Sequence, residues 1–453
     1  MGSKVKKLFA CVMAMLMTLS LLACAAGDDA ANGSNPSADN GDTAGDGGVH
    51  LSMWHITTEP LATILDATLA EWNEKNPDAT VEHLALPSDE FKVKIRTAIG
   101  AESAPNFIFS WGGGVCKSYA DVGALVDLTP VLEEHPELAD VQIPAILENV
   151  TFDGKVYGIP INYVQPAVFF YNKDVFEQVG AEPPTTWDEL MALIPVFNEA
   201  GIPLISVAGQ SQWTYLFYIG YLVDRVGGPE VFERIAANEP GAWSDPAVTT
   251  ALEMIVDLVE AGGFQAGFES INADANADSA LVVNGKAGMV LQHGGKMGAI
   301  MKINPEWFEE GRLGYIEFPA VTGGKGDPDN LYGNTANYWS ISAYASEEEI
   351  DASIRYLTEG MWTNDDYVQS FIDAGTVPAI KGVEEKIAQA TGREADWMTF
   401  VSEITQQAPH FQMSWDNALS PNQSTALLTS LSQVIMQQMT PQEFVDAMNA
   451  TIE

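Results

Sequence analysis

Short apolar runs alternate with amphipathic segments in the part of the chain that follows residue 48. The runs are rich in β-branched and aromatic residues, whereas the segments between them carry apolar residues at helical spacing. This alternation is typical of an α/β fold with mostly parallel sheets. We predict strands at 49–54, 80–86 and 106–111 and helices at 61–73 and 91–100.

The first 23 residues have the pattern of a secretory signal. Three lysines precede an apolar run, 8–22, that is too short for a typical membrane span. The run ends in Leu-Leu-Ala-Cys, which resembles the lipobox of bacterial lipoproteins, where the cysteine is diacylated and becomes the new N-terminus. We therefore expect a signal peptide at 1–23 and a lipid anchor on Cys24. A buried N-terminal helix is the alternative interpretation.

Residues 24–48 are predicted to be a flexible tether. After the cysteine, the stretch contains only Gly, Ala, Asp, Asn, Ser, Thr and one Pro, so it has no large apolar side chain to bury. A tethered lipoprotein fits the extracellular face of the cytoplasmic membrane of a Gram-positive bacterium. A periplasmic lipoprotein is the alternative.

Charge and cysteine content narrow the function classes. The formal net charge is −41, and loss of the three lysines in 1–23 makes it −44. This acidity argues against nucleic acid and against docking on anionic lipid, and it suits a neutral or cationic ligand. Beyond the leader and Cys24 only Cys116 remains, so no intrachain disulfide can form. We expect Cys116 to be buried and structural, not a nucleophile.

Several ordered motifs follow residue 150, and they have a local physical interpretation. Asp153-Gly154 is a hairpin turn signal, and Thr186 followed by Glu189 predicts a capping box. We predict that Trp187 is a core anchor and that 171–173 is a strand and turn. The motifs are DGKVYGIP at 153–160, YNKDVF at 171–176, PPTTWDEL at 183–190, NGKAGM at 284–289 and GTVPA at 375–379.

In order and spacing this series resembles the family 1 extracellular solute-binding proteins of ABC importers, relatives of the maltose-binding protein. The resemblance covers essentially the whole chain beyond the tether. It implies a two-lobed periplasmic-binding-protein-like α/β fold of type II, with the ligand in a cleft between lobes that close on it. We place lobe one at 49–160 plus 320–385 and lobe two at 161–319 plus 386–453.

The resemblance also implies an oligosaccharide ligand, ABC permease subunits as partners, no cofactor or metal, and no catalysis. One closing cleft suffices for capture, so a monomer is expected. An exported glycoside hydrolase with two carboxylates is the remote alternative. HExxH, GxSxG and P-loop patterns are absent from the sequence, which argues against common enzyme classes. The same fold binding a peptide or a polyamine is the nearer alternative.

Sugar recognition needs an aromatic plate for the C–H face of a ring beside amides or carboxylates for its hydroxyls. The chain has 11 tryptophans, several of them in polar contexts, although core packing is the alternative for any one of them. Family position favours Trp111, Trp213 and Trp415, and Gly112 to Gly114 would let backbone approach the ligand closely. The predicted ligand-binding residues are Trp54, His55, Glu59, Trp111, Gly112, Asn162, Tyr163, Gln165, Gln212, Trp213, His293, Gly294, Asn337, Trp339, Trp415 and Asp416.

The stretch 274–278 begins like a calcium loop, Asp-x-Asn-x-Asp. Ser279 replaces the glycine at the sixth position and Gly285 replaces the glutamate at the twelfth, so the pattern fails. We predict a polar surface loop there and no metal site.

Overall fold

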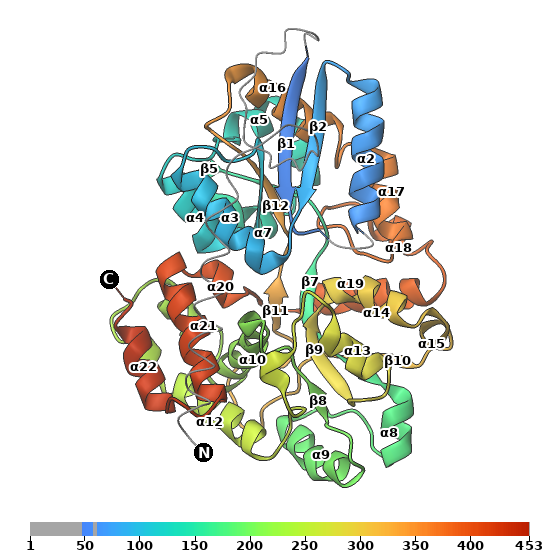
Figure 1. Cartoon of the computed structure of the whole chain (residues 1–453), viewed down its shortest axis with the longest axis vertical. Helices are drawn as coiled ribbons and strands as arrows, with labels where there is room; N and C mark the ends of the chain where they lie inside the picture. The colour runs from blue at the N-terminus through green and yellow to red at the C-terminus, as the bar shows by residue number, and fades with distance from the viewer. Residues whose placement is uncertain (1–47, 58–60, 453) are drawn as a thin grey trace, which may run out of the picture. The chain divides into compact units, whose positions relative to one another are not determined.

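Two β-sheets organise the chain, which the computed structural model describes over residues 48–57 and 61–452 (Figure 1). The predicted signal peptide, Cys24, the tether up to residue 47 and Glu59 lie outside the described residues. In the first sheet, the order is β2-β1-β3-β12-β6; β1 is parallel to β2 and β3, and β12 is antiparallel to β3 and β6. Its strands are β1 (Val49–His55), β2 (Ala79–Ala85), β3 (Phe107–Ser110), β6 (Ile159–Pro160) and β12 (Tyr338–Ile341).

The second sheet has the order β13-β11-β7-β9-β8, with β10 paired to β7. Side chains alternate along its long strand β7: Ala167 and Phe169 enter one core, whereas Val168 and Phe170 enter another. Helices therefore cover both faces of this sheet. Its strands are β7 (Gln165–Asn172), β8 (Ile205–Ser206), β9 (Met289–His293), β10 (Leu313–Ile316), β11 (Leu331–Asn334) and β13 (Phe411–Met413).

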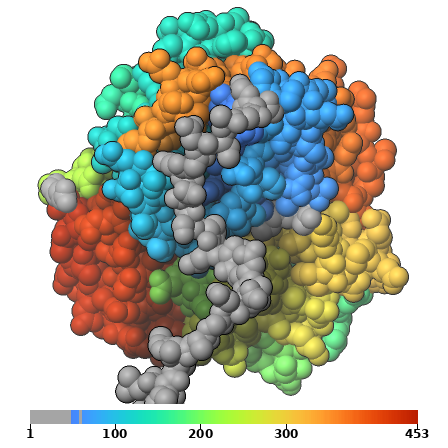
Figure 2. Space-filling model, turned by 45° about the horizontal axis from the view of Figure 1, so that its top comes forward, coloured from blue at the N-terminus to red at the C-terminus, as the bar shows by residue number. Residues whose placement is uncertain are grey.

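Each sheet and its helices form a lobe, which we call lobe one and lobe two. In Figure 2 the blue and orange segments of lobe one lie above the red C-terminal helices of lobe two. The helices of lobe one are α2 (Leu61–Lys75), α3 (Ser88–Gly100), α4 (Gly113–Asp121), α5 (Thr129–Glu134), α6 (Pro136–Val141), α7 (Pro144–Leu147), α16 (Glu347–Glu359), α17 (Asp365–Asp373) and α18 (Glu384–Ile387). Those of lobe two are α8 (Lys173–Val179), α9 (Trp187–Glu199), α10 (Leu216–Gly227), α11 (Glu230–Ala236), α12 (Pro246–Glu260), α13 (Ala277–Val283), α14 (Met297–Ile303), α15 (Pro305–Glu309), α19 (Arg393–Gln407), α20 (Trp415–Ala418), α21 (Pro421–Ile435) and α22 (Pro441–Asn449).

No helix within residues 48–57 and 61–452 combines the length and the apolar character that a membrane crossing requires.

The local predictions are confirmed. The five predicted elements between residues 49 and 111 correspond to β1, α2, β2, α3 and β3. A two-residue turn at Asp153-Gly154, with φ of 51° and 77°, joins β4 (Thr151–Phe152) to β5 (Lys155–Val156). Thr186 and Glu189 form the capping box of α9, and the predicted core residues Trp187 and Cys116 are 4% and 0% exposed.

The chain passes between the sheets at β6–β7, at β11–β12 and again after α18. Strand β11 pairs with β7 and β13, so it belongs to the second sheet. The predicted start of the returning lobe-one segment at 320 is therefore too early. The chain returns to lobe one between Asn334, the end of β11, and Tyr338, the start of β12. It does not return earlier because the loop before β11 is anchored on lobe two.

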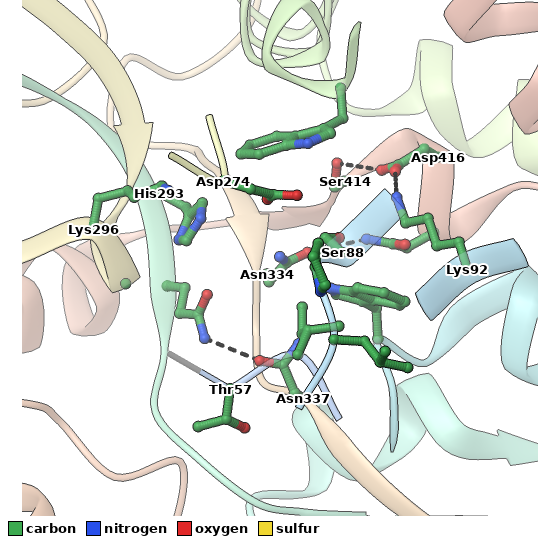
Figure 3. Close-up of a pocket in the computed structure, with 18 of the residues that line it drawn as sticks. Thr57, Ser88, Lys92, Asp274, His293, Lys296, Asn334, Asn337, Ser414 and Asp416 are labelled. Carbon is green, nitrogen blue, oxygen red and sulfur yellow. Dashed lines mark hydrogen bonds and ion pairs between the residues drawn. The ribbon is translucent and has the colours of Figure 1, made fainter. Parts of the chain in front are cut away.

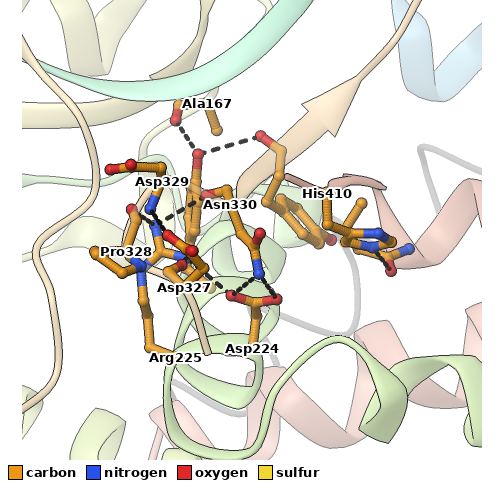
Figure 4. Close-up of polar contacts among 11 residues, drawn as sticks. Ala167, Asp224, Arg225, Asp327, Pro328, Asp329, Asn330 and His410 are labelled. Atoms are coloured by element: carbon orange, nitrogen blue, oxygen red, sulfur yellow. Dashed lines mark hydrogen bonds and ion pairs between the residues drawn. The ribbon is translucent and has the colours of Figure 1, made fainter. Parts of the chain in front are cut away.

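That anchor is Arg225 on α10, whose side chain is buried (Figure 4). Its guanidinium donates to Asp224 Oδ1 at 2.8 Å and to the carbonyl oxygens of Asp327, Pro328 and Asn330 at 3.0, 2.7 and 2.9 Å. It also lies 5.1 Å from the ring centroid of Tyr221. A planar donor with a fixed fork is suited to holding three carbonyls of one loop.

Replacing Arg225 by Met should lower the free energy of unfolding by about 3–5 kcal/mol, because three carbonyls and the Asp224 carboxylate lose a buried cationic partner. Urea unfolding measures the loss. Arg234→Met is the matched control: Arg234 pairs with Asp245 nearer the surface, at 42% side-chain exposure, so its loss should be about 1 kcal/mol or less. Equal losses for the two variants would contradict the anchoring role.

Candidate functional site

A cavity of about 410 Å³ lies where strand ends of the two sheets face each other (Figure 3). Lobe one contributes Thr57 and Trp111, which follow β1 and β3. Lobe two contributes Asn334 at the end of β11 and Ser414 just after β13. Carboxyl ends of strands are the usual ligand site in α/β folds, and the volume is in the range of small-molecule sites.

Two tryptophans, one from each lobe, line the cavity. Trp213, in the 3-10 helix Gln212–Tyr215, is half-buried, and its ring packs against Phe217 and His293 at centroid distances of 5.7 and 5.8 Å. Its indole nitrogen is buried and has no hydrogen-bond partner among the described residues, so the ring offers carbon surface to the cavity. Trp111 is 8% exposed, and the ammonium of Lys92 lies 5.0 Å from its ring centroid.

Amides form the part of the wall where the chain passes between lobes. Asn337 Oδ1 accepts from Gln165 Nε2 at 3.1 Å and from Asn162 Nδ2, and the N–H of Asn337 donates to Asn162 Oδ1 at 2.8 Å. Gln165 and Asn337 line the cavity, whereas Asn162 is buried behind them. The network fixes the two amides that face the cavity.

Four charged groups line the cavity: Lys92, Lys296, Asp274 and Asp416. Lys92 Nζ lies 3.2 Å from Asp416 Oδ2. Lys296 Nζ donates to the Ala273 carbonyl at 2.6 Å and to Asn276 Oδ1 at 2.7 Å, so it holds the loop that carries Asp274. The Asp274 carboxylate attracts the Lys296 ammonium electrostatically but makes no hydrogen bond with another described residue, which leaves its oxygens available as acceptors.

His293 is a neutral wall residue. Burial, with the Lys296 ammonium nearby, lowers the pKa of His293 to about 3. At neutral pH its imidazole therefore carries one N–H and no charge.

Six of the 16 predicted ligand-binding residues come together in the cavity, and their role in binding stays a prediction. They are Trp111, Gln165, Trp213, His293, Asn337 and Asp416.

Two predicted sugar plates are wrong, because their rings are core residues. Trp415 is 0% exposed and stacks on Phe232 at 4.6 Å, in the core of lobe two. Trp339 is 2% exposed and packs edge-on against Phe109 at 5.9 Å, in the core of lobe one. In both cases the neighbouring polar residue, Asp416 or Asn337, is the one that reaches the cavity.

Of the other predicted residues that the structure describes, none lines the cavity. His55, Asn162 and Tyr163 are buried beside it, and the ring of Trp54 lies under Lys94, 4.5 Å from its ammonium. Gln212 is exposed to solvent. Gly294 packs on Trp397, where an added Cβ would lie 3.2 Å from the ring, and Gly112 packs on the Asn149 carbonyl, 2.9 Å from such an atom.

Sequence reasoning missed part of the wall. Ser414 and Asn417 flank residues that were predicted, and Asn334 lies three residues before Asn337, so proximity to a polar cluster was an available signal. Lys92 stands on a helix with no distinguishing pattern. The other missed polar residues are Thr57, Ser88, Asp274 and Lys296.

The predicted polar surface loop at 274–278 is wrong in two respects. Asp274 lines the cavity, and Asp278 is fully buried, where it accepts from Gln292 Nε2 at 2.7 Å and from the Ser279 N–H at 2.8 Å. Desolvation raises the pKa of Asp278. Across residues 48–57 and 61–452, no group of three or more His, Cys, Asp and Glu is placed to hold a metal ion.

A two-lobed α/β fold with a polar and aromatic cavity between the lobes defines a solute-binding protein. The model of the bacterial extracellular solute-binding proteins matches residues 56–400, and the chain belongs to this family. The family consists of binding proteins that work outside the cytoplasm.

Individual relatives share only part of their length with this chain, at low sequence identity. The chain is 27% identical over 209 residues to the ABC transporter extracellular-binding protein PH1039 of Pyrococcus horikoshii, covering 45% of this chain and 48% of that one. It is 33% identical over 138 residues to the diacetylchitobiose binding protein NgcE of Streptomyces coelicolor, covering 30% and 28%. These matches span about half or less of each relative.

Among solved structures, one from work on xylan utilisation by Caldanaerobius polysaccharolyticus matches 89% of this chain and 100% of its own. Its TM-score is 0.79 and its sequence identity is 26%.

His55, the last residue of β1, is buried beside the cavity and contacts the more exposed His83 of β2. The N–H of Thr57 donates to His55 Nδ1 at 3.1 Å, so the proton of the neutral ring is on Nε2, which donates to His83 Nδ1 at 2.9 Å. His83 Nε2 lies 3.1 Å from Asp66. Burial, and then the nearby His83, lower the pKa of His55 from 6.5 to about 4.

The folded protein thus binds this proton more weakly than the unfolded chain. The free energy of unfolding is therefore not reduced by His55 above pH 6.5. It falls by about 3 kcal/mol as the pH is lowered towards 4, because the unfolded chain takes up the proton first. Urea unfolding at pH 7 and pH 4 should show a smaller fall for His55→Asn than for the wild type. His50→Asn, an exposed position on the same strand, should behave as the wild type. The same fall in all three proteins would contradict the buried neutral ring.

Proposed function

We propose that this protein is the receptor of an ABC importer, which captures a short oligosaccharide outside the cytoplasm and delivers it to membrane permease subunits. The observation that carries the proposal is the pairing of an aromatic carbon face, Trp213, with the free carboxylate of Asp274 and the amide of Asn337 in one cavity. An aromatic plate beside polar groups that orient hydroxyls is what a sugar ring requires.

The charges of the cavity support a neutral ligand. Both ammonium groups are engaged, Lys92 by Asp416 and Lys296 by loop oxygens, so neither is free to bind an anion. A relative named for diacetylchitobiose binding and a similar structure from work on xylan utilisation are consistent with a short glycan. The Asp274 carboxylate, which makes no hydrogen bond with another described residue, favours one competitor, a polyamine, and the fluorescence test includes it.

The proposal extends to the rest of the chain. Lobe one comprises 48–160 and about 337–387, and lobe two comprises about 165–334 and 393–452, with crossings between them. The chain acts as a monomer and performs no catalysis. A signal peptide at 1–23, a lipid on Cys24 and the tether keep the receptor on the extracellular face of the cytoplasmic membrane of a Gram-positive cell.

Mass spectrometry of the N-terminal peptide should find a diacylglyceryl group on Cys24, because the lipobox directs lipidation of that cysteine. An intact leader on the mature protein would contradict the lipid anchor.

Tryptophan fluorescence tests the ligand class. The chain without residues 1–23 and with Cys24→Ser should show a saturable change with xylotriose or diacetylchitobiose, and no change with spermidine or a tripeptide. Chromatography of the mixture should recover the sugar uncleaved. Binding of spermidine alone would overturn the sugar assignment while keeping a solute receptor.

Trp213→Ala should weaken binding of that sugar by about 2 kcal/mol or more, about thirtyfold, because the stacking surface is lost. Calorimetry measures the affinity, and circular dichroism confirms the fold. Trp54→Ala is the matched control: this half-buried tryptophan lies outside the cavity, so its removal should leave the affinity unchanged. An equal effect of the two substitutions would contradict the cavity as the binding site.

A further inference from the structure

Lobe one and lobe two touch through their backbones beside the cavity. The first turn of α4, in lobe one, packs against α20 and the residue after it, in lobe two. A Cβ atom added at Gly113 would lie 2.3 Å from the Asn417 carbonyl oxygen, and one added at Gly114 would lie 2.5 Å from that of Leu419. No side chain fits between these surfaces.

The need for glycine differs between the two positions. Gly113 has φ of 63°, a conformation that favours glycine in any surroundings, whereas Gly114 is not among the residues with positive φ. Gly114 is therefore required only by the proximity of lobe two. The Gly112–Gly114 turn is predicted to let backbone approach a ligand, but at Gly113 and Gly114 it is the opposite lobe that approaches.

An ion pair lies next to this contact. Lys92 on α3 of lobe one reaches Asp416 on α20 of lobe two, 3.2 Å away, and their side chains are 28% and 5% exposed. Asp416 Oδ1 also accepts from Ser414 Oγ at 2.8 Å, which fixes the carboxylate. Both members of the pair line the cavity (Figure 3). The pair and the glycine contact thus both join lobe one to the α20 region of lobe two, the pair from α3 and the glycines from α4.

We propose that the α4–α20 contact and the Lys92–Asp416 pair form a latch that holds the two lobes in the closed arrangement, so that Gly114 acts as a positioning residue for ligand capture. This rests on the proposed capture of a solute between closing lobes. Apparent affinity scales with the fraction of molecules in the binding-competent arrangement. A latch that raises this fraction raises affinity without touching the ligand.

Gly114→Ala tests the latch against Gly100→Ala. Both substitutions add one methyl group to a helix of lobe one and both favour helix formation. The site at Gly100 is open, with no heavy atom within 4 Å of the added Cβ. Small-angle scattering of the ligand-free chain lacking residues 1–23, with Cys24→Ser, should give a larger radius of gyration for Gly114→Ala only. An unchanged radius would overturn the latch, whatever happens to affinity.

Affinity supplies the second readout. For xylotriose or diacetylchitobiose, Gly114→Ala should weaken binding by about tenfold while Gly100→Ala should not. If neither sugar binds the wild type, the proposed ligand fails, and the scattering comparison still decides the latch. A larger radius with unchanged affinity for a bound sugar would overturn the positioning role.

Lys92→Met tests the latch independently, because it removes the ion pair with Asp416 and leaves Gly114 in place. It decides the question if Gly114→Ala does not fold. It should enlarge the ligand-free radius and weaken sugar binding, and Asp416→Asn should do the same. Lys117→Met is the control, because Lys117 pairs with Asp121 within α4 and touches neither the cavity nor lobe two. Tighter binding by Lys92→Met would show that the pair competes with the ligand, and would overturn the latch.

Discussion

Asn337 joins two of the three passages of chain between the sheets, those at β6–β7 and β11–β12, and the position of the cavity depends on it. Its side-chain oxygen accepts from Asn162 and Gln165, its N–H donates to Asn162, and its carbonyl accepts from the Ile161 N–H at 2.9 Å. The side-chain oxygen, the backbone N–H and the backbone carbonyl of Asn337 are thus all engaged. Hydrogen bonds between buried groups favour one arrangement, since breaking them would leave buried polar atoms unpaired.

In that arrangement, the ends of strands from both sheets line one cavity. The first sheet presents loops after parallel strands β1, β2 and β3, and the second presents the ends of β9, β11 and β13. No element contributes more than a few side chains, so the cavity exists only in the assembled fold. The chemistry that results is mixed: carbon surface from Trp213, a free carboxylate from Asp274, and amides held by their neighbours. It suits a ligand with both flat apolar faces and many hydroxyls.

The fold was predictable from sequence because its signals are local. Strand runs, helical spacing, the Asp153-Gly154 turn and the Thr186 capping box each act within a few residues, and each is present in the structure. The site was predictable only in part. A tryptophan in a polar context has the same local pattern whether its ring faces a cavity, as at Trp213, or a core, as at Trp415. Tertiary packing decides between them.

The same limit explains Asp274 and Gly114. The local sequence around Asp274 indicates only a failed calcium loop, because the position of Asp274 on the cavity depends on Lys296, 22 residues later in the chain. The local sequence around Gly114 predicts room for a ligand, but the neighbour of Gly114 is a carbonyl more than 300 residues away. Neither contact leaves a local pattern. Asp416 and Asn337, the polar neighbours of the mispredicted Trp415 and Trp339, were nonetheless predicted correctly to lie at the cavity. A cluster of polar and aromatic residues in the sequence indicates a cavity wall even where it does not indicate which side chain faces the cavity.

The most direct test of the account is a crystal structure of the chain with its best-binding glycan. The account predicts a sugar ring against the face of Trp213, with hydroxyls within hydrogen-bond distance of Asp274 and Asn337, between the two lobes. A glycan bound elsewhere, or one in the cavity that contacts neither Trp213 nor Asp274, would contradict it.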